Sequence, residues 1–186
     1  MTTLVFCLEE ESAKLLLQGF LPKLIPSDIE IRYLVFEGKQ DLRKQLGKRL
    51  RGWIAPNTRF VVIHDQDSAD CVKVKSELKD ICNRAGKPDT LIRIACHELE
   101  SFYLGDLRAV EEALSIAGLS RLQASRKFRT PDALNNAAEE LKKITANKYQ
   151  KLNGSRSISA KMLADGSNRS QSFNHLCSGI LKLLAA

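Results

Sequence analysis

The chain has 186 residues, of which 44% are hydrophobic and 27% charged. This is the composition of a globular protein, and it excludes a disordered or fibrous chain. No apolar stretch approaches the roughly 20 residues that cross a bilayer, so we expect no membrane partner. The first residues lack a basic segment before their short apolar run, which argues against a secretory signal. The five cysteines include no C-x-x-C pair, which is typical of reduced thiols in a cytoplasmic protein.

The net charge of +7 is unevenly distributed along the chain. Residues 121–186 hold 12 basic and 4 acidic residues, whereas residues 1–120 hold 17 basic and 18 acidic ones. Counted in this way, the excess of positive charge lies in the last third. Such asymmetry predicts a polyanionic partner, of which nucleic acid is the main candidate. The alternative is a set of basic helices that are merely solvated.

Four short apolar runs predict strands, and segments of helical periodicity lie between them. The predicted strands are 3–8, 29–36, 59–64 and 90–96, and the helices between them are 11–24, 41–53 and 69–85. This alternation is typical of right-handed βαβ units. We therefore expect an α/β fold, a Rossmann-like parallel sheet of about four strands flanked by helices.

The pattern changes after the fourth strand. Residues 98–118 are predicted to be helical with a break at Gly105 and Asp106, and Pro131 is expected to start a helix that ends near residue 144. The remaining segments are a polar connection and two short helices, predicted at 145–157, 158–164 and 172–184. The chain is thus expected to form an α/β core, residues 1–120, and a basic helical extension, residues 121–186, packed on that core.

Acidic residues follow three of the four predicted strands. Glu9 follows the first, Asp65 and Asp67 the third, and Glu98 and Glu100 the fourth. In an open parallel sheet these strand ends share the edge where ligands bind. Converging carboxylates repel one another, and Mg²⁺ or Mn²⁺, which prefer oxygen ligands, would relieve that repulsion. The five acids therefore predict a site for one of these ions.

Several of these acids also have a purely structural alternative. Asp65, Asp67 or Ser68 could cap the following helix. Glu98 and Glu100 are two residues apart, so on a regular helix only one of them would face the site. His64 ends an apolar run and is expected to be a buried histidine whose hydrogen bonds are satisfied.

Other catalytic patterns are absent. The zinc motif H-E-x-x-H fails after His97 because Ser101 stands in place of the second histidine. The sequence contains no G-x-S-x-G, G-x-x-x-x-G-K-[ST] or G-x-G-x-x-G motif. Serine-hydrolase, P-loop and dinucleotide-binding functions therefore lose their main support.

Two motifs carry a family resemblance. A strand followed by glutamate (LVFCLEEESAK) and a later strand followed by D-x-D (FVVIHDQD) resemble the toprim domain of topoisomerases, primases and overcoming-lysogenization-defect-type nucleases. The chain more closely resembles a bacterial family known as domain of unknown function 4276. That resemblance is carried by residues 36–52, 61–71, 94–106, 126–134 and 168–173.

The resemblance implies a toprim-type sheet that binds Mg²⁺ at its edge. Glu9 matches the toprim glutamate, a ligand or general acid/base, and Asp65 and Asp67 match the metal-binding D-x-D. Many toprim proteins have Glu-Gly at the first motif, whereas this chain has Glu9-Glu10, and no nucleophilic tyrosine or fused ATPase can be assigned. The family context further implies a partner ATPase and a role in phage defence.

From the residues and the resemblance we expect a Mg²⁺-dependent nuclease with Glu9, Asp65 and Asp67 as catalytic residues. Its predicted nucleic-acid contacts are Lys148, Lys151, Arg156, Lys161 and Arg169, supported by Arg126, Lys127 and Arg129. Two alternatives remain open. One is a regulatory module that docks a partner ATPase without turnover, and the other is a receiver-like phosphoacceptor.

Overall fold

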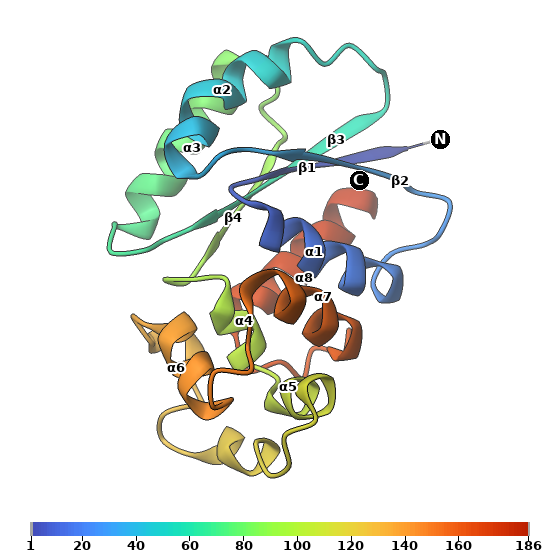
Figure 1. Cartoon of the computed structure of the whole chain (residues 1–186). Coiled ribbons are helices and arrows are strands. Elements are labelled where there is room, and N and C mark those ends of the chain that lie inside the picture. The colour runs from blue at the N-terminus through green and yellow to red at the C-terminus, as the bar shows by residue number, and fades with distance from the viewer. Residues whose placement is uncertain (1, 186) are drawn as a thin grey trace.

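A computed structural model describes residues 2–185. It contains a four-stranded sheet, ordered β2-β1-β3-β4, in which every neighbouring pair is parallel (Figure 1). The strands are β1 (Thr3–Leu8), β2 (Glu30–Val35), β3 (Thr58–Asp65) and β4 (Leu91–Ala95). The predicted α/β fold with about four parallel strands flanked by helices is thereby confirmed.

The central strand β1 is buried along its whole length. Its side chains alternate between two hydrophobic clusters, since Leu4, Phe6 and Leu8 belong to one and Val5 and Cys7 to the other. This alternation follows from the pleat of a strand, which points successive side chains to opposite faces. Burial on both faces explains why the strand is a continuous apolar run.

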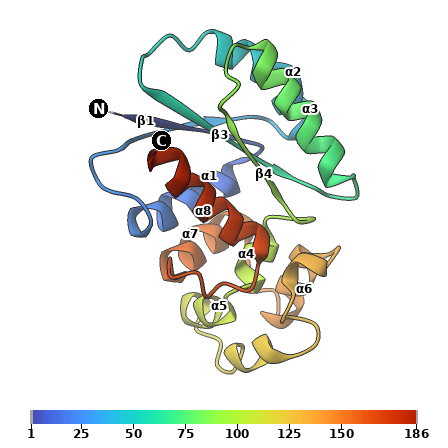
Figure 2. The same ribbon diagram turned by 180° about the vertical axis from the view of Figure 1, so that it is seen from behind.

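The helices cover both faces of the sheet. Helices α2 (Lys39–Arg51) and α3 (Cys71–Arg84) lie together on one face, and α1 (Glu11–Phe20) lies on the other (Figures 1 and 2). The reversal of direction between the β1–β2 and β2–β3 connections places α1 and α2 on opposite faces when both crossovers are right-handed.

The remaining helices gather on the α1 side of the sheet and below it. They are α4 (Glu100–Leu104), α5 (Leu107–Leu114), α6 (Ala137–Ile144), α7 (Lys151–Lys161) and α8 (Gln171–Ala185). The predicted break at Gly105 and Asp106 is confirmed, because α4 ends before it and α5 begins after it. Asp106 caps α5 by accepting the Ala109 N–H at 3.0 Å.

Two predictions in this region are wrong. Pro131 starts only a 3-10 turn, Pro131–Ala133, and the helix proper, α6, begins at Ala137. Residues 145–157 are not simply a connection, because α7 begins at Lys151 and ends at Lys161.

Small side chains explain why the sequence of α7 shows no helical period of apolar residues. Its buried face includes Gly154, Ser155 and Ser159 rather than a stripe of large apolar residues. A methyl group on Gly19 of α1 would lie 2.1 Å from Ser159 Oγ, so the two helices approach closely. Close backbone approach requires residues without bulky side chains, and such residues give no amphipathic signal.

The last third of the chain shares its core with the α1 side of the sheet. Phe173 of α8 packs edge-on against Phe20 of α1, with 4.8 Å between ring centroids, and also against Phe102 of α4. Ile158 of α7 belongs to the same hydrophobic cluster. Asp132 fixes the start of α8, accepting hydrogen bonds from Ser170 Oγ at 2.6 Å and Ser172 N at 2.7 Å.

Across residues 2–185, none of the helices combines the length and the apolar character needed to cross a membrane.

Candidate functional site

The candidate site lies at the carboxyl ends of the neighbouring strands β1 and β3, from which the chain continues toward opposite edges of the sheet. The chain leaves β1 toward β2 on one side, whereas β3 and β4 add to the other. Glu9 directly follows β1, and Asp65 is the last residue of β3. The Asp65 backbone N–H donates to Glu9 Oε2 at 3.2 Å, which joins the two strand ends. Ligands of open α/β sheets bind at this kind of switch point.

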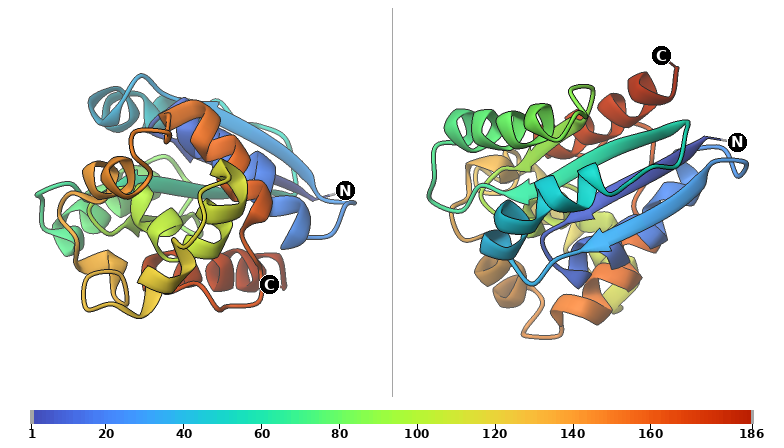
Figure 3. Two further views of the ribbon diagram at one scale, coloured as in Figure 1. Left: turned by 60° about the horizontal axis from the view of Figure 1, so that its bottom comes forward. Right: turned by 90° about the horizontal axis from the view of Figure 1, so that it is seen from above.

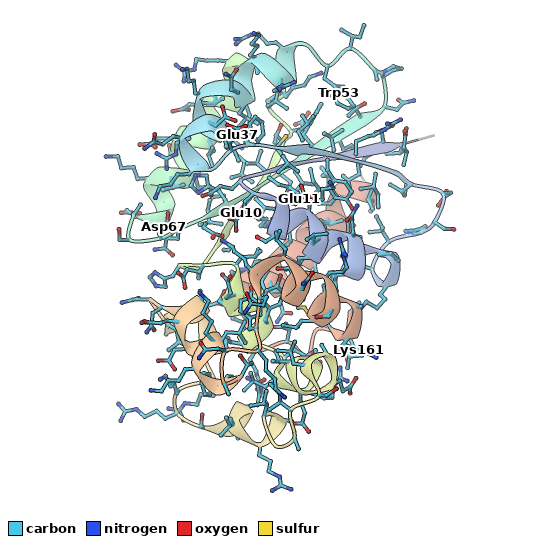
Figure 4. All side chains as sticks on the ribbon, viewed as in Figure 1. Glu10, Glu11, Glu37, Trp53, Asp67 and Lys161 are labelled. Carbon is cyan, nitrogen blue, oxygen red and sulfur yellow. The ribbon has the colours of Figure 1, made fainter. Side chains whose placement is uncertain are left out.

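A pocket of about 270 Å³ opens beside Glu9 and Asp65. It lies between the sheet edge and the α4, α6 and α7 region, and Figure 4 shows Glu10 and Asp67 at this edge. The five acids predicted from the sequence all line it. The lining residues are Glu9, Glu10, Asp65, Asp67, Glu98, Glu100, Ala138, Lys142, Tyr149 and Lys151.

Two loops at the pocket hold each other in an unusual backbone conformation. Asp67, after β3, and His97, after β4, both have positive φ angles, 52° and 61°. The Asp67 N–H donates to the His97 carbonyl at 2.8 Å, and His97 Nδ1 donates to the Asp67 carbonyl at 2.9 Å. Left-handed conformations of non-glycine residues store strain and cluster at functional sites. The loops are therefore fixed as one unit.

Lysines neutralise the outer acids of the pocket. Lys39, the first residue of α2, donates to Asp67 Oδ2 at 2.7 Å, and Lys151 of α7 donates to Glu10 Oε2 at 2.7 Å. The hydrogen bond to Asp67 is also the main reason why the pKa of Lys39 is raised. Neither contact reaches the inner pair, Glu9 and Asp65.

Glu98 and Glu100 both line the pocket but have different partners. Glu98 Oε2 accepts the Ala138 N–H at 2.8 Å, in the first turn of α6. Glu100 is 3% exposed and accepts the Tyr149 hydroxyl at 2.9 Å. A short helix that starts at Glu100 after an irregular turn lets both side chains reach the same pocket, which a regular helix would prevent.

Burial sets the electrostatics of the inner acids. Burial raises the pKa of Asp65 well above its ordinary value, and the neighbouring Glu9 and Glu100 raise it further. Burial likewise raises the pKa of Glu9 and of Glu100. Lys151 offsets part of this repulsion at Glu100, but within residues 2–185 Glu9 and Asp65 have no direct ion pair with a lysine, so their end of the pocket favours a bound positive charge.

His64 differs from its predicted state. Its Nδ1 donates to the Asp65 carbonyl at 2.6 Å and lies 3.6 Å from Glu9 Oε2. Its Nε2 is buried and has no hydrogen-bond partner among the described residues. The histidine is therefore only half satisfied, and it lies directly behind the Glu9 carboxylate.

The capping alternatives for the D-x-D segment are wrong. Helix α3 is capped by Asp70, whose Oδ1 accepts the Val72 N–H at 2.8 Å and the Lys73 N–H at 3.3 Å. Asp65 and Asp67 lie before this cap and face the pocket.

Of the five predicted nucleic-acid contacts, only Lys151 is among the residues that line the pocket. Lys161 at the end of α7 lies on the far side of the molecule from Asp67 (Figure 4). Lys148, Arg156 and Arg169 are exposed. Sequence reasoning missed Lys39, Lys142 and Tyr149 as neighbours of the acids. Only Lys39 carried a signal, because it follows β2 at the same edge.

No metal site is preformed among residues 2–185, where no three His, Cys, Asp or Glu side chains are close enough together to hold an ion. The acids surround the pocket without converging on one point. An ion in this pocket would therefore take most of its ligands from water or from a bound substrate.

The model of a family described as a domain of unknown function, number 4276, matches residues 8–181. No curated protein and no solved structure matches the chain.

Proposed function

The chain belongs to the domain of unknown function 4276 family, and from the geometry of its pocket we propose that it hydrolyses phosphodiester bonds of nucleic acid with the help of Mg²⁺ or Mn²⁺. The observation that carries this proposal is the joined pair of Glu9 and Asp65 at the β1/β3 switch point. These two acids share one pocket with Asp67, Glu98 and Glu100.

The residues present fit a hard divalent cation. Every acidic donor is a carboxylate oxygen, and no thiol lines the pocket. Mg²⁺ is usually held by one or two carboxylates, with waters and substrate phosphates filling the other positions. The raised pKa values of Glu9 and Asp65 support this fit, because a cation would favour their ionised forms.

Glu9 and Asp65 would hold the ion, and Asp67 would join them once released from Lys39. Glu98 and Glu100 would orient its waters from the opposite wall. When bound, the ion lowers the pKa of an attacking water and neutralises charge on the phosphodiester. The hydrogen bond between Asp65 N and Glu9 Oε2 fixes the Glu9 carboxylate, so its second oxygen remains for a ligand.

The lysines of the rim supply the phosphate-binding groups. Lys39, Lys142 and Lys151 stand around the acids, from α2, α6 and α7. A phosphate entering the pocket would replace Asp67 as the partner of Lys39. It would likewise replace Glu10 as the partner of Lys151. A mixed rim of this kind binds an anionic substrate while the acids keep the cation.

Hydrolysis of bis(p-nitrophenyl) phosphate and of labelled DNA with Mg²⁺ or Mn²⁺ tests the proposal. We expect Glu9→Gln and Asp65→Asn to lower the rate by more than about 100-fold, since even outer partners of metal ligands are worth about 10–100-fold. Glu11→Gln is the matched control, because Glu11 pairs with Lys14 at 2.8 Å outside the pocket.

An unchanged rate in Asp65→Asn would overturn the proposed reaction. Metal binding without turnover would instead favour a regulatory module, such as one that docks a partner ATPase.

A receiver-like phosphoacceptor is the second candidate, supported by the topology. The order β2-β1-β3-β4 with acids after β1 and β3 also suits receivers. Within the described residues, however, Cys96 and His97 follow β4, and no later strand delivers a lysine. Labelling of Asp65 by acetyl phosphate, lost in Asp65→Asn, would favour this candidate over hydrolysis.

A further inference from the structure

Helices α2 and α3 carry a positive charge that a count along the chain hides. The 13 residues of α2 include six Lys or Arg and one acid, and the 14 residues of α3 include four Lys or Arg and two acids. Ten basic and three acidic residues leave a surplus of seven, equal to the net charge of the whole chain. In a count of residues 1–120, the acids elsewhere in that segment cancel this surplus.

The surplus on α2 faces solvent. Leu42, Leu46 and Leu50 are fully buried at a spacing of four residues. Lys44, Lys48 and Arg51 therefore form a stripe on another face of the helix, and all three are exposed. At 1.5 Å per residue this stripe extends for about 10 Å along the axis.

These charges have no partner in the described part of the chain. Arg43 pairs with Glu77 of α3 and Lys39 with Asp67. Between residues 2 and 185 no ion pair involves Lys44, Lys48, Arg49 or Arg51. Unpaired like charges on one helix repel one another, so the stripe favours an external anion.

Helix α2 begins at the acidic pocket and leads away from it. The Gly38 N–H, immediately before the helix, donates to the Glu9 carbonyl at 2.9 Å. The other end of α2 is followed by Trp53, which Figure 4 shows far from Asp67. Figure 3 (right) looks down on the α2 side of the sheet. A chain of phosphates lying on α2 would thus reach the pocket at Lys39.

A groove of about 740 Å³ runs beside the stripe, between α2 and the edge strand β2. The acids Glu37 and Asp41 line it near the start of α2, and Lys48, Arg49 and Trp53 line it near the other end of the helix. Its lining residues extend from Asp41 to Trp53, along most of the helix, and such a surface suits a linear polymer better than a small ligand.

We propose that the Lys44–Lys48–Arg51 stripe of α2, with Arg49, binds the phosphate backbone of the nucleic acid that the pocket acts on. This inference rests on the proposed function for the identity of the polymer. Phosphate contacts of nucleic-acid-binding proteins are made largely by Lys and Arg and carry no sequence preference. An acidic protein fits the stripe less well, because protein interfaces have apolar or aromatic centres with little Lys, and the leucines of α2 are buried.

The test is DNA binding by Lys44→Gln/Lys48→Gln/Arg51→Gln, measured in a Glu9→Gln background that does not cut the probe. The control is Lys143→Gln/Lys148→Gln/Arg156→Gln, which loses the same charge from exposed positions of the last third. Fluorescence anisotropy of a labelled duplex, and of its single strand, is followed as salt is raised. Circular dichroism checks that both variants are folded.

We expect the α2 variant to lose at least about tenfold in affinity at low salt, and its slope of log affinity against log salt to fall by about 2–3. The control is expected to lose less than the α2 variant by both measures. Equal affinity of the α2 variant and its parent, or an equal loss in the control, would overturn the inference. Binding of polyglutamate in preference to DNA would overturn it in favour of an acidic protein.

The experiments distinguish a failure of the binding inference from a failure of the proposed reaction. Loss of DNA binding in the α2 variant, in a protein that never cuts DNA, would support the inference and overturn the proposed reaction. Cleavage of DNA by wild type and α2 variant at equal rates would support the reaction and overturn the inference.

Discussion

Replacing Asp65 with asparagine should stabilise the metal-free protein while abolishing the proposed hydrolysis. Asp65 is a buried carboxyl whose pKa is raised, first by burial and then by Glu9 and Glu100. Each unit by which a folded-state pKa exceeds the unfolded value costs about 1.4 kcal/mol once both states are ionised. Asparagine removes the charge and keeps an oxygen that can accept the Leu99 N–H, which lowers the pKa of Asp65.

The direction of the effect follows from this linkage. With one buried acid relieved, and its neighbours Glu9 and Glu100 relieved of repulsion, we expect Asp65→Asn to gain about 0.5–2 kcal/mol at neutral pH, the usual range of a single stabilising substitution. For a chain of this length each kcal/mol raises the melting temperature by about 2–4 °C.

The sign of the pH dependence is also fixed. The folded protein holds protons on these acids at pH values where the unfolded chain has released them, so stability falls as pH rises above about 4. The gain of Asp65→Asn should therefore be largest near neutral pH and vanish in acid, and its profile should be flatter than that of wild type.

Thermal melts in EDTA between acidic and neutral pH measure this, with Glu11→Gln as the control. Mg²⁺ should raise the melting temperature of wild type more than that of Asp65→Asn. A variant that is less stable than wild type at neutral pH, or a gain that does not depend on pH, would refute the electrostatic reasoning.

Three further predictions concern one hydrogen bond of the pocket and the packing of two glycines. Tyr149→Phe removes the hydrogen bond from the Tyr149 hydroxyl to Glu100 and should lower the free energy of unfolding, measured in urea, by about 1.5–3 kcal/mol. A loss no larger than that of the control Tyr33→Phe would contradict this prediction. Gly105→Ala would place a methyl 1.9 Å from Asn168 Oδ1 and 2.7 Å from Ser170 N and should cost about 1–3 kcal/mol. Gly47→Ala, inside α2 and meeting only ordinary contacts, should instead stabilise by up to about 1 kcal/mol; a gain in both glycine variants would contradict the packing.

The centre of the sheet was predictable because β1 and β3 are buried on both faces. Residues 4–8 and 60–63 are continuous apolar runs within the predicted strands 3–8 and 59–64, and the structure places β1 at 3–8 and β3 at 58–65. Parallel topology then brings the residues after each strand to one edge, which is why the five acids could be grouped from the sequence alone. Helix α7 was not predictable, since its buried glycine and serines lack an apolar period.

The finer arrangement of the site depends on contacts between distant segments. Nothing local in the sequence indicates that Lys39 pairs with Asp67, or that Tyr149 bonds with Glu100. The charge of α2 was visible as a run of Lys and Arg, but it was averaged away by acids elsewhere in the same segment. Charge counts become informative only when they are made by surface rather than by position in the chain.

The reciprocal hydrogen bonds between Asp67 and His97 have a consequence for the energetics of ligand capture. Because each turn holds the other in place, neither can relax by itself when the pocket is empty. A loose loop would lose conformational entropy when it binds a ligand, whereas these two turns have already lost it on folding. A ligand of the proposed kind would therefore meet a preorganised wall, and its capture would require little beyond the release of Lys39 from Asp67 and of Lys151 from Glu10.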